Sequence, residues 1–240
     1  MHGFRFAALI ATLSFGAASQ AAADPSGNPF NNSDLSGWTT TAGKPAPAGW
    51  EVIDGVIHLK PGKSQGGNIV TAHSYGDFSL SFDWKIAPKG NSGIKYRVRD
   101  YKGKVLGLEY QMYDDGATKK PGPARGSTGS LYDLYEPTPA GQANPPGEWN
   151  TGRIVVCGNR IEHWLNGKLI VTAYVGSSEW NKRVAESKFD DIPHFAQNTV
   201  GKLMITDHGS EVWIRNARFE TLSESRPGRR PLFRRLLGSR

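Results

Sequence analysis

The chain has 240 residues, a formal net charge of +7 and a single cysteine, so an intrachain disulfide is excluded. The positive charge lies at the two ends of the chain. Without Arg5 and the six arginines of residues 226–240, the body has a net charge of zero. We therefore expect one neutral domain of the all-β size class and no nucleic-acid partner.

The first 23 residues are typical of a secretory signal. Arg5 precedes an apolar run over 6–15, and small residues follow as far as Ala23. The apolar run is shorter than the ~20 residues of a membrane-spanning helix. We predict export to the periplasm, the extracellular space or the cell envelope. We also predict a linker over 24–33, one domain over 34–222 and a basic tail over 223–240, with a solvated arm or an anionic-surface contact as alternatives for the tail.

Seven segments alternate apolar and polar residues with period two, as half-buried strands do. They cover residues 78–86, 94–98, 106–112, 154–165, 169–174, 203–206 and 212–219. Asn166-Gly167 predicts a tight hairpin between two of them. No long amphipathic helix interrupts the strands. The pattern predicts a two-sheet antiparallel β-sandwich, with a closed barrel as the alternative.

Two long segments, 114–130 and 136–150, are too polar or too rich in proline and glycine to be strands. Long loops in a compact domain are often functional. Cys157 ends the apolar run 154–157, which predicts a small buried hydrophobic residue.

The polar residues of three strands are the first candidates for chemistry. If these strands are neighbours, their non-core faces join a carboxylate, cations and an amide, which together could move a proton and stabilise negative charge. The alternative is a solvated face with cross-strand ion pairs. The residues are Asp83, Lys85, Lys95, Arg97, Glu109 and Gln111.

Histidines and aromatic residues supply further candidates. His163 lies in a strand, where it is either a buried, hydrogen-bonded histidine or an acid, and His208 lies at a turn. Tyr113 and Trp149 lie at strand ends or in loops, where aromatic rings suit sugars or cap the sandwich. Asp114 precedes a glycine turn, and is either a turn former or a ligand for sugar hydroxyl groups.

Common catalytic and metal motifs are absent from the sequence, including HExxH, CxxC, GxSxG and the phosphate-binding loop. We therefore predict no cofactor, and leave a metal ion open because β-sandwiches of this kind can bind calcium. The sequence makes no prediction of oligomeric state.

An ordered set of strings over roughly residues 34–222 resembles the domain of unknown function 1080, also described as the 3-keto-disaccharide hydrolase domain. The strings are GDFSLSFDWKI from Gly76, GNSGIKYRVR from Gly90, GLEYQMYDD from Gly107, TGSLYDLYEP from Thr128, PPGEWNTGRIVVCGNRIEHWLNGKLI from Pro145, SKF from Ser187 and DHGSEVWIRNARF from Asp207. The resemblance implies a concanavalin A-like jelly roll and a carbohydrate substrate with a ketone at carbon 3 of one sugar.

In such a substrate the ketone acidifies the proton on carbon 2, so a base can remove it and the enolate can expel the group on carbon 1. By matching strings, the resemblance implies Glu109 or Asp83 as the base, although the side chain of Asp83 is one carbon shorter than the family's usual glutamate. It implies Arg97, together with Lys95, for the enolate, and Gln111 for hydroxyl groups. We expect His163 or His208 as the acid.

Two other functions stay open from the sequence. The first is a non-catalytic carbohydrate-binding sandwich that uses the same face. The second is an ordinary glycosidase, which needs two carboxylates about 5 to 10 Å apart across a cleft.

Overall fold

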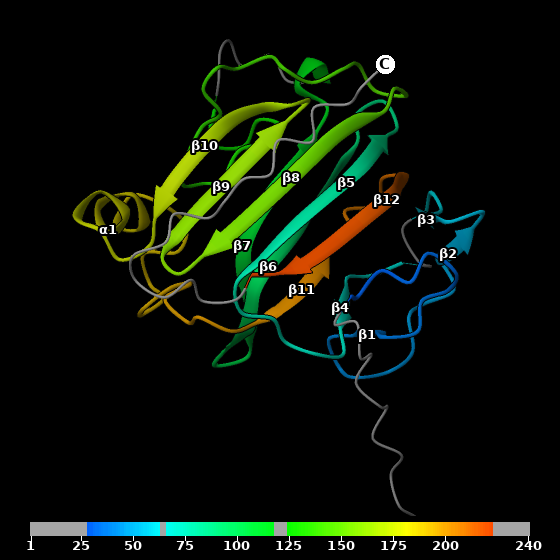
Figure 1. The fold of residues 1–240 in the computed structure, drawn as a ribbon, viewed down its shortest axis with the longest axis horizontal. Coiled ribbons are helices and arrows are strands. Elements are labelled where there is room, and N and C mark those ends of the chain that lie inside the picture. The colour runs from blue at the N-terminus through cyan, green and yellow to red at the C-terminus, as the bar shows by residue number, and fades with distance from the viewer. Residues whose placement is uncertain (1–27, 63–65, 118–123, 223–240) are drawn as a thin grey trace, which may run out of the picture.

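A computed structural model describes residues 28–62, 66–117 and 124–222, which form two packed antiparallel sheets (Figure 1). The five strands of the smaller sheet, called sheet A, are, in spatial order, β1 (Trp38–Thr40), β4 (Ile69–Thr71), β11 (Lys202–Ile205), β6 (Asn91–Tyr101) and β7 (Lys104–Tyr113). The seven strands of the larger sheet, called sheet B, are β10 (Lys168–Tyr174), β9 (Arg160–Leu165), β8 (Asn150–Cys157), β5 (Phe78–Ile86), β12 (Val212–Thr221), β3 (Val56–Leu59) and β2 (Trp50–Ile53).

This arrangement confirms the predicted sandwich of the concanavalin A-like jelly-roll class. All seven predicted strand segments are extended, although the segment 154–165 is two strands, β8 and β9, separated by a turn at Gly158-Asn159. The Asn166-Gly167 hairpin is confirmed. Both of its residues have positive φ angles, 47° and 79°, as a turn of type I′ requires.

The four strands before residue 72 were not predicted, because each has only three or four residues and shows little alternation. A short helix, α1 (Ser178–Ala185), was not predicted either. The hydroxyl group of Ser177 caps it by accepting a hydrogen bond from the backbone N–H of Trp180, whose ring is buried. Within the described ranges, no helix is long and apolar enough to cross a membrane.

The three terminal segments predicted from the sequence are the signal, the linker and the basic tail. The predicted signal and the basic tail lie outside the described residues. Within the segment predicted as a linker, Phe30 is only 1% exposed and packs edge-on against the ring of Trp38. The fold therefore begins earlier than the predicted boundary at residue 34.

The core lies between the sheets and is built from alternate residues of the long strands. Phe82 of β5 and Tyr110 of β7 meet edge to face across it, with ring centroids 5.4 Å apart. Cys157 is exposed, contrary to the prediction, because β8 directs Ile154 and Val156 inward and Cys157 is out of phase with them.

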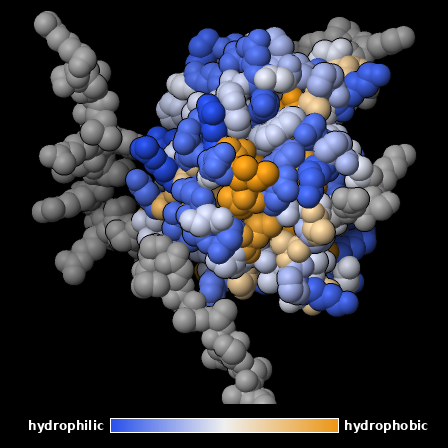
Figure 2. Space-filling model, turned by 90° about the vertical axis from the view of Figure 1, so that its right-hand side faces the viewer, coloured by the Kyte–Doolittle hydropathy of each residue, from blue (hydrophilic) through white to orange (hydrophobic). Residues whose placement is uncertain are grey.

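Large exposed apolar side chains occur at both edges of sheet B. In the edge strand β2, Ile53 is 54% exposed, and Leu169 and Tyr174 are exposed in β10 at the other edge. Figure 2 faces the side of the molecule where β2 and β3 lie, and shows a narrow apolar strip within a mostly polar surface.

Strands β5 and β6 follow one another in the sequence but belong to different sheets. The connection over residues 87–90 crosses from sheet B to sheet A. The premise that the three polar strand faces are neighbours is therefore wrong for β5. Alternation identifies the side chains that face the core, but it does not tell which sheet a strand joins.

Candidate functional site

The outward face of sheet A carries a pair of opposite charges on adjacent strands. Lys95 of β6 and Glu109 of β7 are register partners, and their side chains lie on the face opposite the core. Lys95 Nζ lies 3.5 Å from Glu109 Oε2, and the hydroxyl of Thr206 donates to Glu109 Oε1 at 3.3 Å. Glu109 is only 5% exposed. The carboxylate is therefore held in place by a cation and a hydroxyl group in a largely desolvated position.

A glycine makes room for this carboxylate. Gly93 lies beside Glu109 on β6, and a Cβ atom at Gly93 would be 2.5 Å from Glu109 Oε1. Gln111 follows Glu109 on the same face of β7 and adds an amide, whose Nε2 donates to Asn91 Oδ1 at 3.0 Å. The strings around residues 91–97 and 107–115 thus build one polar site, called here the sheet A site, with Lys95, Glu109 and Gln111 at its centre.

A second lysine and a tyrosine join the sheet A site from outside the sheet. The backbone N–H of Tyr132 donates to the carbonyl of Glu109 at 3.0 Å, which attaches the loop after residue 124 to β7. Lys188 Nζ lies 4.1 Å from the centroid of the Tyr132 ring. Both residues fall in the strings TGSLYDLYEP and SKF, and Tyr132 is a loop aromatic that would suit a sugar ring, but strand alternation does not connect either residue with Glu109.

Burial and neighbouring charges change how these two groups hold protons. Burial lowers the pKa of the Lys188 ammonium group, Glu109 opposes this effect, and Lys95 adds to it. Burial raises the pKa of the Tyr132 phenol, and the nearby charge of Glu109 raises it further. The amine is therefore better able to release its proton, whereas the phenol retains its own at neutral pH.

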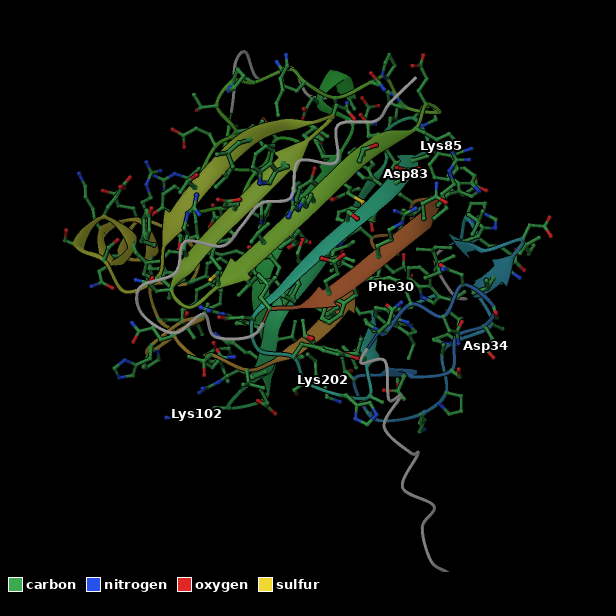
Figure 3. The ribbon with its side chains drawn as sticks, in the orientation of Figure 1. Phe30, Asp34, Asp83, Lys85, Lys102 and Lys202 are labelled. Carbon is green, nitrogen blue, oxygen red and sulfur yellow. The ribbon has the colours of Figure 1, made fainter. Side chains whose placement is uncertain are left out.

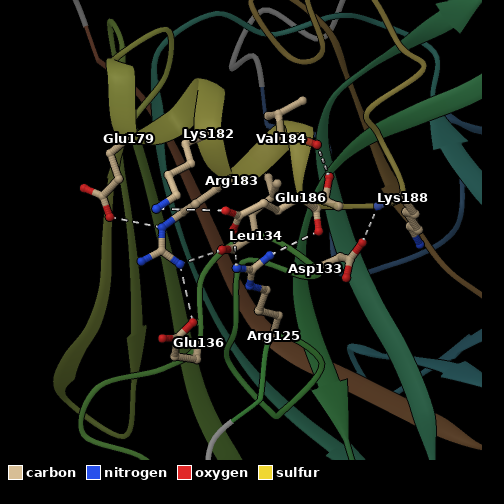
Figure 4. A network of polar contacts seen from close by, with 11 residues as sticks. Arg125, Asp133, Leu134, Glu136, Glu179, Lys182, Arg183, Val184, Glu186 and Lys188 are labelled. Carbon is tan, nitrogen blue, oxygen red and sulfur yellow. Dashed lines mark hydrogen bonds and ion pairs between the residues drawn. The ribbon is translucent and has the colours of Figure 1, made fainter.

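A network of polar contacts attaches Lys188 and α1 to the loop that carries Tyr132 (Figure 4). Asp133 Oδ2 accepts the backbone N–H of Lys188 at 2.8 Å. Arg125 binds the carboxylate of Glu186 at 3.1 Å, and Arg183 donates to the carbonyl of Leu134 at 3.0 Å. Segments 49 to 61 residues apart in the sequence are thereby held together next to the sheet A site.

Asp83 and Lys85 do not belong to the sheet A site, so the prediction that they share a face with Glu109 is wrong. Both lie on the outward face of sheet B (Figure 3). Asp83 accepts hydrogen bonds from Thr151 and Asn216 at 3.1 and 2.7 Å. Lys85 Nζ lies 4.2 Å from the ring centroid of Trp213. Arg215 Nε also lies 3.5 Å from Asp83 Oδ2 on the neighbouring strand, which matches the alternative of a solvated face with cross-strand ion pairs.

Arg97 also points away from the sheet A site. A bulge in β6 after Tyr96 breaks the alternation, and Arg97 has a φ angle of 52°. Its guanidinium group donates to the carbonyl oxygens of Ala196, at 3.3 Å, and Gly158. Arg97 is 2% exposed, and burial lowers its pKa. Arg97, predicted to bind the enolate, instead connects sheet A by hydrogen bonds to the loop that contains Ala196 and to the turn between β8 and β9.

The two histidines occupy different surroundings. His163 is fully buried between the sheets, where its ring nitrogens meet the hydroxyl of Tyr96 at 2.8 Å and the carbonyl of Gly129 at 3.0 Å. This is the buried histidine of the alternative interpretation, and burial lowers its pKa to about 4. His208 is exposed in the turn after β11, two residues from Thr206.

The remaining predicted ligands are divided among other contacts. The Trp149 ring is covered by Arg215, whose guanidinium carbon is 3.8 Å from its centroid, so it stacks on a cation of sheet B. Asp114 accepts the backbone N–H groups of Lys89 and Gly116 at 2.7 and 3.0 Å, as the turn-former alternative requires. Tyr113 and Asp114 line a hollow of about 300 Å³ at one end of the sandwich.

In the described parts of the chain, no group of three or more histidine, cysteine, aspartate or glutamate side chains is arranged to hold a metal ion.

Two sheets in jelly-roll order, with a lysine–carboxylate pair on one outward face, define a β-sandwich of the concanavalin A-like jelly-roll class. The pattern of the 3-keto-alpha-glucoside-1,2-lyase-like domain matches residues 26–220, and the chain belongs to this family. A curated relative from Bacteroides thetaiotaomicron, named 3-keto-disaccharide hydrolase, is 28% identical over 226 residues, which cover 80% of this chain and 77% of the relative.

Two solved structures from Parabacteroides distasonis, both assigned as glycosyl hydrolases, share the fold. The first is 34% identical with a TM-score of 0.71, and the match covers 81% of this chain and 93% of that one. The second is 26% identical with a TM-score of 0.64, and the match covers 79% and 96% of the two chains.

Proposed function

We propose that this chain is an enzyme that cleaves glycosides bearing a ketone at carbon 3, by elimination followed by addition of water, at the sheet A site. The observation that carries the proposal is the buried carboxylate of Glu109 beside the ammonium group of Lys95, 3.5 Å away. The family and the curated relative support a substrate of this class.

The reaction uses the two groups in sequence. Glu109 removes the proton from carbon 2, which the neighbouring ketone has acidified, and Lys95 stabilises the negative charge that moves to the ketone oxygen. The enolate then expels the oxygen on carbon 1 and leaves a carbon–carbon double bond. Water adds to carbon 1, and Glu109 returns its proton to carbon 2. The sum is hydrolysis of the glycosidic bond.

Two observations favour this mechanism over the other functions. An ordinary glycosidase needs two carboxylates that face each other, and the two predicted carboxylates, Asp83 and Glu109, lie on different sheets. A lectin-like sandwich needs open aromatic faces for sugar rings, whereas Arg215 covers Trp149 and Lys188 covers Tyr132.

The test is incubation of the full-length protein with 3-keto-trehalose and, separately, with trehalose. We expect release of glucose from the keto sugar alone, because unoxidised trehalose lacks the acidic proton. Glu109→Gln keeps the size of the side chain and removes the base, so turnover should fall by about 100-fold or more.

Asp83→Asn is the matched control, since it makes the same chemical change on the opposite sheet and should leave turnover within a factor of two. Binding of both sugars without turnover of either would contradict the proposal and favour a lectin. Cleavage of unoxidised trehalose at a similar rate would favour an ordinary glycosidase.

A further inference from the structure

We propose that Lys188 is the general acid of the sheet A site, which donates a proton to the glycosidic oxygen as it leaves carbon 1. This inference rests on the proposed function and adds a residue to it. The elimination transfers one proton to Glu109, but the departing oxygen needs another, and His163, one of the two histidines predicted for this role, does not face the sheet A site. His163 is fully buried in the core, and its ring nitrogens are engaged by Tyr96 and Gly129.

The position of Lys188 fits the role. Its ammonium nitrogen lies over the ring of Tyr132, 4.1 Å from the centroid, and the adjacent backbone N–H of Tyr132 is bonded to the carbonyl of Glu109. The charged groups whose electrostatic fields act on Lys188 are Glu109 on β7, Lys95 on β6 and Asp133 in the loop between β7 and β8. Lys188 thus reaches the sheet A site from outside the sheet, whereas Lys95 and Glu109 rise from the strands.

The surroundings also suit proton donation. An ordinary lysine holds its proton too firmly to be an efficient acid near neutral pH. Burial lowers the pKa of Lys188, and Lys95 adds to this, whereas Glu109 and Asp133 act in the opposite direction and keep the group charged before the reaction.

The protons balance over the whole cycle. The ammonium group of Lys188 gives its proton to the leaving oxygen as the bond to carbon 1 breaks, and becomes a neutral amine. When water adds to carbon 1, the amine takes a proton from that water and returns to the ammonium form. Glu109 returns its own proton to carbon 2, so both residues end in their starting states.

A structural role and a role as an acid can be separated by the leaving group. A sugar alkoxide leaves poorly without protonation, whereas 4-nitrophenolate leaves without an acid. We therefore compare kcat on 3-keto-trehalose with kcat on 4-nitrophenyl 3-keto-glucoside for the full-length wild type, Lys188→Met and Lys188→Arg. Lys44→Met, which alters an exposed lysine outside the sheet A site, is the matched control.

For Lys188→Met we expect a loss of about 100-fold or more on 3-keto-trehalose and less than about tenfold on the nitrophenyl substrate. Lys188→Arg should show the same split, because arginine keeps the positive charge but does not release a proton at this pH. If Lys188→Met folds poorly, Lys188→Arg still tests whether Lys188 is the general acid. Lys44→Met should match the wild type on both substrates.

Equal losses on the two substrates, or wild-type turnover of 3-keto-trehalose by Lys188→Arg, would overturn the role of Lys188 and leave the proposed function intact. A wild type that cleaves neither keto substrate would overturn both.

Discussion

The ammonium group of Lys95 and the carboxylate of Glu109 face each other across strands β6 and β7, with Nζ and Oε2 3.5 Å apart. Both side chains are mostly withdrawn from water, and the strand register fixes their separation. A charge pair in such surroundings interacts more strongly than one at the surface, and it is already oriented before a substrate arrives.

Replacement of Lys95 by methionine should lower kcat on 3-keto-trehalose by about 100-fold or more, because the enolate then loses its nearest strand-borne cation. Lys85→Met is the matched change on sheet B. It removes contacts with the rings of Trp213 and Trp149 and should cost about 1 kcal/mol of unfolding free energy without a comparable loss of kcat. Steady-state kinetics and urea unfolding of both variants measure this. Similar kcat values for the two variants would exclude a special role for Lys95.

Arg97→Met should lower the unfolding free energy and leave kcat nearly unchanged. The change leaves the carbonyl oxygens of Ala196 and Gly158 without their donor, which should cost about 2 to 4 kcal/mol of unfolding free energy. The kcat of the folded fraction should stay within a factor of about three. Arg99 lies two residues further along β6 and, unlike Arg97, is exposed, so Arg99→Met should lower the unfolding free energy by less than Arg97→Met does. A loss of kcat at unchanged unfolding free energy would show that Arg97 takes part in the reaction.

The buried ring of His163 should make stability depend on pH. Its pKa is lowered to about 4 in the folded protein by burial, below the ordinary value of 6.5. Between these values the unfolded chain binds a proton that the folded protein does not, so the unfolding free energy falls as pH falls. The loss from pH 7 to pH 4 should approach about 3 kcal/mol from this residue.

His163→Gln retains polar atoms for Tyr96 and Gly129 but does not titrate. The variant should be less stable than the wild type at pH 7 and should lose less unfolding free energy on acidification. Urea titrations at pH 7, 5.5 and 4.5 measure the difference. Parallel losses in both proteins would show that His163 does not cause this part of the pH dependence.

Asp133 is expected to position Lys188 through the backbone. Asp133→Ala removes the acceptor of the Lys188 N–H, and also places alanine at a φ angle of 62°, which alanine rarely adopts. The kcat on 3-keto-trehalose should fall by about 10-fold to 100-fold. Asp133→Asn keeps an acceptor oxygen and tolerates this φ angle, so it should restore most of the rate.

The asparagine variant also gives a charge-specific readout. Asp133 raises the pKa of Lys188, so removal of its charge should move the alkaline limb of the pH–rate profile to lower pH. An unchanged limb would mean that Lys188 does not control it. Failure of asparagine to restore the rate would argue against positioning through the hydrogen bond.

Within the regular parts of the long strands, the sequence alone determined which side chains face the core. Period-two alternation identified β5, β6, β7 and β12, and Asn166-Gly167 identified a hairpin, because both signals depend only on residues close together in the chain. It also placed Lys95, Glu109 and Gln111 on one face, because β6 and β7 are consecutive and form a hairpin.

Only the tertiary structure decided which of these faces meet. Asp83 alternates as regularly as Glu109, but β5 joins the opposite sheet, and the bulge after Tyr96 turns Arg97 away from its expected side. Lys188 lies far from Glu109 in the sequence and reaches it through the contacts of α1 with the 125–136 loop. Strand alternation specifies a side of a strand, whereas a site requires non-local pairing and loop packing, which a local pattern does not encode.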